Sequence, residues 1–226
     1  MSRNFARCAA AVGIAASIAS GGSIAAAEQP TTKIDITKDG IGAPPADFEF
    51  QRTGEGELGQ WRVVRDPTVI GGAAIEHLST DQHDDRFPLA IYQPLNVENV
   101  EVSVRFKIIS GTLQTAGIAL CLRNPSNYYA VGASALEHRV DLLLFANGKS
   151  ERIEGAEAEV TLNRWHTLKV TVNDDHFAVS FDNKLLFTTF DRARMKDGRV
   201  ALWTQEDNVT RFDQIEIRVL PPTEWP

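Results

Sequence analysis

Two acidic side chains, Glu137 and Asp207, are the candidates for acid–base catalysis in this sequence. Enzymatic hydrolysis of a glycosidic bond typically uses two carboxyl groups that face each other across a cleft. Glu137 would need Asp207 or Asp213 in the same cleft, with at least one pKa raised. The chain has no E-x-D-x-x-E strand motif, no G-x-S-x-G and no P-loop. The sequence therefore leaves open whether the protein is an enzyme.

Aromatic and polar residues gather in two places, around 127–137 and around 203–212. Aromatic rings stack on the apolar faces of sugars, while amides and carboxylates bond the hydroxyl groups. We expect Tyr129 and Trp203 to stack on a sugar ring. The alternative is that Tyr and Trp fill the core, and strand alternation places Tyr128 and Tyr129 on opposite faces. The candidate ligand-binding residues are Arg123, Asn127, Tyr129, Glu137, Trp203, Thr204 and Asp207.

Metal binding has two candidate positions. His77, Asp81 and His83 crowd one short stretch with two further aspartates at 84–85, although polar clusters in loops are usually only solvated. Asp213, in a late strand, is the candidate ligand of a structural calcium ion. We expect no cofactor, with calcium at Asp213 as the alternative.

The glycines at 54, 56 and 59 match the spacing of a dinucleotide-binding loop. Glu55 and Glu57 would repel a pyrophosphate, and a strand-like segment follows where a helix is required. The stretch is therefore expected to form a glycine-rich turn.

Alternation of apolar and polar residues predicts strands almost throughout. It is clearest at 100–108, 168–172 and 177–181. Further strands are expected at 48–52, 61–66, 73–79, 87–93, 115–123, 127–136, 139–146, 198–205 and 211–219. Turn residues separate them, most clearly Asn147-Gly148 and Asp182-Asn183. The pattern predicts an all-β, two-sheet antiparallel sandwich of the jelly-roll type.

The N-terminus has the features of a bacterial export signal. Arg3 and Arg7 precede a small apolar stretch at 9–19, and Ala25 to Ala27 form a cleavage site. We expect a signal peptide over 1–27, an arm over 28–46, a sandwich over 47–220 and a tail over 221–226. The protein would be periplasmic or secreted with no membrane span. Without its leader it would keep a single cysteine, Cys121, and no internal disulfide.

The composition excludes several classes of protein. The 226 residues are 43% hydrophobic and 23% charged, which is ordinary for a globular protein. The net charge of −7 and the lack of a basic block argue against nucleic-acid binding.

Five segments carry a resemblance to a known family: 86–91, 102–107, 127–137, 165–168 and 202–213. They resemble the concanavalin A-like lectin/glucanase superfamily, and within it a family labelled 3-keto-disaccharide hydrolase or laminin-G-like. The resemblance covers about residues 48–219. It implies a jelly-roll fold with one sheet face open to a saccharide. The implied functions are saccharide recognition, hydrolysis of a (3-keto-)disaccharide, or a non-catalytic envelope interaction.

The chain departs from this family at five positions: Cys121, Gly132, Ser134, Leu144 and Gln205. Related sequences usually carry basic or amide residues there, which project from the ligand-facing sheet. Their replacement removes donors suited to anionic or densely hydroxylated ligands. The sequence is thus a divergent member, for which we expect a saccharide ligand.

Overall fold

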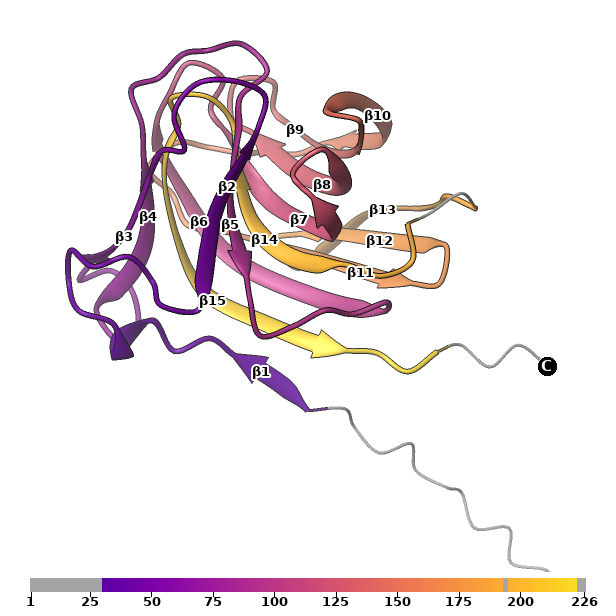
Figure 1. The fold of residues 1–226 in the computed structure, drawn as a ribbon, viewed down its shortest axis with the longest axis horizontal. Coiled ribbons are helices and arrows are strands. Elements are labelled where there is room, and N and C mark those ends of the chain that lie inside the picture. Colours follow the sequence, from indigo (N-terminus) through magenta and orange to yellow (C-terminus); the bar gives the residue numbers. More distant parts are fainter. Residues whose placement is uncertain (1–29, 193–194, 223–226) are drawn as a thin grey trace, which may run out of the picture.

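Two antiparallel β-sheets packed face to face form nearly all of the described structure (Figure 1). The structure is a computed structural model that describes residues 30–192 and 195–222. The expected signal peptide, its cleavage site after Ala27 and most of the expected tail lie outside these residues.

The first sheet has eight strands in the order β13-β12-β11-β6-β15-β4-β3, with β1 paired to β15. Its strands are β1 (Thr31–Lys33), β3 (Gln60–Arg65), β4 (Ala73–Leu78), β6 (Val100–Ser110), β11 (His166–Asn173), β12 (His176–Phe181), β13 (Lys184–Phe190) and β15 (Val209–Val219). The predicted alternating segments at 100–108, 168–172 and 177–181 are strands β6, β11 and β12 of this sheet.

The second sheet has seven strands in the order β10-β9-β8-β7-β14-β5-β2. Its strands are β2 (Phe48–Thr53), β5 (Phe87–Tyr92), β7 (Thr115–Asn124), β8 (Asn127–Ser134), β9 (Arg139–Ala146), β10 (Lys149–Glu157) and β14 (Arg199–Thr204). The helical content of the described residues is one 3₁₀ turn, η1 (Ile36–Lys38). The all-β, two-sheet antiparallel prediction is therefore confirmed.

The core lies between the sheets because each strand turns one row of apolar side chains inward. On β6 the inward row of Val102, Val104 and Phe106 is fully buried, while Ser103 and Arg105 on the other face are partly exposed. This period-two pattern is the one that a half-buried strand requires. Burial of these apolar rows supplies most of the stabilisation of the sandwich.

Tight turns join neighbouring strands where the sequence predicts them. Asn147 and Gly148 have φ values of 52° and 79° in the β9–β10 connection. Asp182 and Asn183, between β12 and β13, have φ values of 46° and 65°. Positive φ at both central residues matches the twist of a hairpin, and Asn, Asp and Gly tolerate it best.

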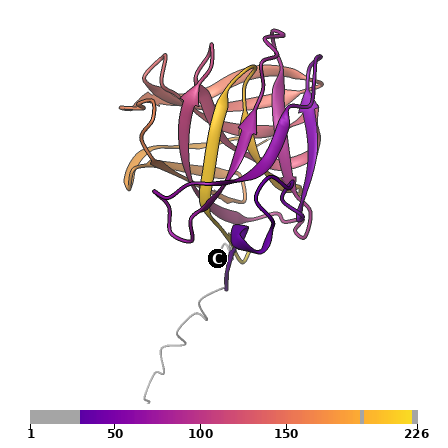
Figure 2. The same cartoon turned by 90° about the vertical axis from the view of Figure 1, so that its left-hand side faces the viewer.

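The start of the described chain returns to the end of the sandwich. Strand β1 pairs antiparallel with the last part of β15, so the start of the described chain lies beside its end (Figure 1, Figure 2). Ile36, in η1, is buried in the core. Among the described residues there is no helix with the length and apolar character needed to cross a bilayer.

Candidate functional site

A groove of about 180 Å³ opens on the face of the second sheet that points away from the core. Its lining combines the ends of four adjacent strands, β9, β8, β7 and β14, with residues of the loops next to them. The lining residues are Leu113, Thr115, Gly132, Ser134, Leu136, Glu137, Asp141, Leu143, Trp203 and Gln205.

Strand register brings the polar lining residues together. Thr115 on β7 pairs with Ser134 on β8, and Gly132 pairs with Asp141 on β9. Because side chains alternate along a strand, residues paired in this way point to the same face. The groove therefore presents a hydroxyl pair next to a carboxylate.

Gly132 keeps the floor of the groove open to the Trp203 ring. A Cβ atom at this position would lie 2.9 Å from Trp203 Cζ3 and 3.2 Å from Thr115 Cγ2. Trp203 forms the inner end of the groove, but its side chain is fully buried. It therefore closes the groove without offering an exposed ring face.

An ion pair stiffens one wall. Arg139 Nε donates to both carboxylate oxygens of Asp141 at 2.8 Å. Gly155 on β10 makes room for this pair, because a Cβ atom there would lie 1.9 Å from Asp141 Oδ1. Ser134 Oγ accepts a hydrogen bond from the Glu137 N–H at 3.1 Å and fixes the β8–β9 turn.

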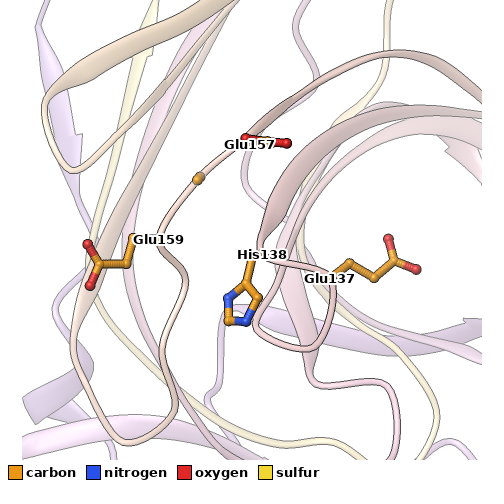
Figure 3. Close-up of a pocket in the computed structure, with 5 residues that line it drawn as sticks. Glu137, His138, Glu157 and Glu159 are labelled. Carbon is orange, nitrogen blue, oxygen red and sulfur yellow. The ribbon is translucent and has the colours of Figure 1, made fainter.

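Glu137 also borders a second, wider hollow of about 530 Å³ (Figure 3). His138, Glu157, Ala158 and Glu159 complete its lining. In Figure 3 the three glutamate side chains point in different directions, with His138 between Glu137 and Glu159. The carboxylates thus do not converge on one point.

Aromatic side chains from distant strands meet across the same sheet face. The ring of Phe87 on β5 lies 4.8 Å from that of Phe145 on β9, which stacks on Tyr128 at 4.3 Å. Thr53 Oγ1 lies 2.8 Å from the Tyr128 hydroxyl, and burial raises the pKa of that phenol. The sheet must curve strongly to allow these contacts, so this face is concave. The expectation that one sheet face stays open to a saccharide is therefore wrong for the middle of this face, which the protein's own rings fill.

Three of the predicted ligand-binding residues are buried. Tyr129 points into the core between the sheets, 1% exposed, and its hydroxyl donates to Asp191 Oδ2 at 2.7 Å. Thr204 is fully buried and donates to the Thr115 carbonyl at 3.3 Å. With Trp203 also enclosed, neither aromatic ring has a face on which a sugar could stack.

Two other predicted residues lie at the opposite end of the sheet. Arg123 is near the far end of β7 from Thr115, roughly 25 Å away at about 3.3 Å per strand residue, and it pairs with Asp197 at 3.4 Å. Asn127 Oδ1 accepts the Asn147 N–H at 3.2 Å. The structure thus separates Arg123 and Asn127 from the groove.

Asp207 does not line the groove and has a different set of partners. Its carboxylate accepts hydrogen bonds from the Thr112 N–H at 2.7 Å and from Gln82 Nε2 at 2.9 Å. Burial raises the pKa of Asp207, but these hydrogen bonds outweigh it and lower the pKa below its usual value. Of the candidate pair, only Glu137 is at the groove.

The proposed metal ligands are occupied by other contacts. Asp213, 2% exposed, accepts hydrogen bonds from Arg105 Nε at 2.9 Å and Nη2 at 2.8 Å. His77 is buried, and its Nδ1 donates to the Asn208 carbonyl at 2.7 Å, whereas Asp81 and His83 contact each other at the surface. Within residues 30–192 and 195–222, no three His, Cys, Asp or Glu side chains are placed to hold a metal ion.

Sequence reasoning missed the Arg139–Asp141 ion pair in the wall of the groove, although both residues share one face of a predicted strand. The family departures were more informative. Gly132, Ser134 and Gln205 line the groove on the outer face of the second sheet. Cys121 and Leu144 instead pack toward the core between the sheets.

A two-sheet sandwich with a polar groove on a concave sheet defines a lectin-like β-sandwich protein. Residues 100–220, more than half of the chain, match the model of the family described as "Galactocerebrosidase, C-terminal lectin domain". The chain belongs to this family. A search of curated proteins finds no match.

Solved structures support the same fold. The carbohydrate-binding module CBM66 from Bacillus subtilis aligns with a TM-score of 0.58 and 17% identity, over 75% of this chain and 94% of that one. A Bacillus subtilis protein of unknown function with a galectin-like fold gives 0.54 and 10%, over 77% and 91%. The cellulose-induced protein Cip1 gives 0.57 and 10%, over 79% and 94%. At these identities the likeness shows the fold.

Proposed function

We propose that the protein is an exported, periplasmic or secreted, carbohydrate-binding protein that holds a saccharide in the groove beside Trp203. The proposal rests mainly on the groove itself, which places polar side chains of different kinds on one concave sheet face. It is supported by membership of a lectin-domain family and by the fold shared with a carbohydrate-binding module.

The lining suits a sugar chemically. Thr115 and Ser134 offer hydroxyl groups, and Gln205 offers an amide that can donate and accept. Leu136, 54% exposed, and Leu143 supply aliphatic contact for the C–H face of a sugar ring. A few polar groups set among apolar side chains are typical of small-molecule sites.

Hydrolysis is the second candidate, and the geometry favours it less. A glycosidase needs two carboxyl groups free to face the scissile bond. Glu137 and Asp141 both line the groove, but Arg139 bonds both oxygens of Asp141. We therefore place binding ahead of catalysis.

The test is a glycan screen followed by calorimetry on the full chain without its leader. Gln205→Ala removes about one hydrogen bond and should weaken binding about fivefold. Thr188→Ala, an exposed change on β13 of the other sheet, is the matched control and should leave affinity unchanged. Loss of binding on Arg123→Ala, with Gln205→Ala silent, would move the site to the other end of the sheet.

A further inference from the structure

We infer that the groove selects saccharides that carry no negative charge, and that Glu137 sets this selection. The inference rests on the proposed function, because it assigns the class of ligand to the same groove. It concerns recognition and requires no catalytic step.

The ionisable side chains that line the groove are both acidic. Asp141 and Glu137 are the ionisable residues among its lining, and they differ in their partners. Asp141 is neutralised by Arg139 at 2.8 Å and lies 4.0 Å from Arg152. No cation in the described part of the chain forms an ion pair with Glu137. Glu137, whose charge reaches Arg139 only through a longer-range interaction, is therefore the lining carboxylate without an ion-pair partner among the described residues.

The neighbouring hollow strengthens this negative field. Glu157 and Glu159 line it together with Glu137 (Figure 3). Arg164 and Lys184 lie in a separate hollow that shares Glu157 and Glu159 but not Glu137. A ligand carboxylate in the groove would thus meet Glu137 with neither Arg164 nor Lys184 beside it.

The nearest arginine is committed to the protein. Arg139 directs Nε and Nη2 at Asp141, so a ligand carboxylate could bind it well only by displacing that residue. Arg139 is the kind of side chain that would otherwise recognise an acidic sugar, since guanidinium groups match carboxylates in geometry. The ion pair therefore removes the groove's own means of binding an anion.

Repulsion by one partly screened charge should weaken an acidic sugar about fivefold or more relative to its neutral counterpart. A sugar with a free amine avoids the repulsion and gains a modest attraction. The ligand class is accordingly a neutral or amino-bearing saccharide. Uronic acids and sulfated sugars are rejected.

The experiment compares two matched series of methyl glycosides: glucose, glucosamine and glucuronic acid, and galactose, galactosamine and galacturonic acid. Dissociation constants are measured at neutral pH by ligand-observed NMR, at low and at raised salt. In the series that binds, we expect the amino sugar to bind at least as tightly as the neutral sugar, and both to bind more tightly than the acid. Added salt should narrow the gap, because it screens the repulsion.

Glu137→Gln should remove most of the discrimination against the acid, and Glu216→Gln, the same change on β15 of the other sheet, should not. If the neutral sugar binds and the acid binds as tightly or more tightly, the charge selection alone is overturned. The same holds if Glu137→Gln leaves the ratio of the acid and neutral dissociation constants unchanged. Absence of binding by all six sugars overturns the proposed function for these ligands and the inference with it.

Discussion

The rings of Phe87 and Phe145 are 4.8 Å apart with planes at 75°, although three strands separate β5 from β9 in the sheet. Edge-to-face packing of this kind is favourable for aromatic pairs. The contact shows that the second sheet curls far enough to bury a second apolar cluster on its own concave face. This cluster leaves the groove as an opening near one end of that face.

Truncating Phe145 should destabilise the protein strongly. Phe145→Ala removes a buried ring that contacts Phe87 and Tyr128 and should cost about 3–5 kcal/mol in the free energy of unfolding. The emission of Trp203, which packs against the same ring, should shift to the red as its surroundings hydrate. Urea unfolding and fluorescence measure both effects. Phe145→Leu keeps apolar bulk but loses the ring contacts, so it should cost clearly less than Phe145→Ala and still destabilise the protein. A negligible cost for Phe145→Leu would show that the ring contacts are unimportant.

Gly59 is predicted to tolerate no side chain. Its φ is +77°, and a Cβ atom would lie 2.2 Å from His77 Nε2 and 3.1 Å from Arg86 Nη2, both buried. Gly72 has a similar φ of +70°, but a Cβ atom there would have no neighbouring atom within 4 Å. Gly72→Ala should therefore cost only the backbone strain, about 1–2 kcal/mol, and Gly59→Ala clearly more. Equal melting temperatures for the two variants would contradict this explanation of the Gly59 loop.

Acid should destabilise the protein through His77. Burial lowers the pKa of His77 from its usual 6.5 to about 4, and nearby Arg86 adds to this effect. The unfolded chain gains a proton as the pH falls through 6.5, while the folded protein gains it only near 4. The contribution of neutral His77 to the free energy of unfolding is therefore fully present above pH 6.5 and falls by about 3 kcal/mol toward pH 4.

The measurement is urea unfolding between pH 4 and 7 for the wild type and His77→Gln. Subtracting the two curves cancels the contributions of His83 and Glu206, whose pKa values are raised. If the free energies of unfolding of the wild type and His77→Gln change with pH in parallel, His77 protonates equally in the folded and unfolded states.

Calcium is expected to leave the melting temperature unchanged, because Arg105 takes both oxygens of Asp213. Asp213→Asn should destabilise by about 3–5 kcal/mol, since it leaves Arg105 without its buried partner. Differential scanning calorimetry with added calcium or a chelator checks the first expectation. A calcium-dependent rise that Asp213→Asn abolishes would restore the metal-site hypothesis.

The sequence predicts the sheets well because their signals are local. Alternation at 100–108 and the Asn147-Gly148 turn depend on residues close together in the chain. The site depends on long-range curvature, which no local pattern encodes. Tyr128 and Tyr129 could be assigned to opposite faces, but only the Phe87–Phe145 contact shows that both faces are filled. Family departures at Gly132, Ser134 and Gln205 located the groove better than the aromatic residues did.

Backbone amide chemical shifts, followed while the saccharide identified by the screen is added, test the location of the site most directly. We predict saturable shifts at Gly132, Ser134 and Gln205 and at the Trp203 indole, with little change near Arg123. Shifts confined to the Arg123 end, or to the outer face of the other sheet, would contradict a binding site in the groove.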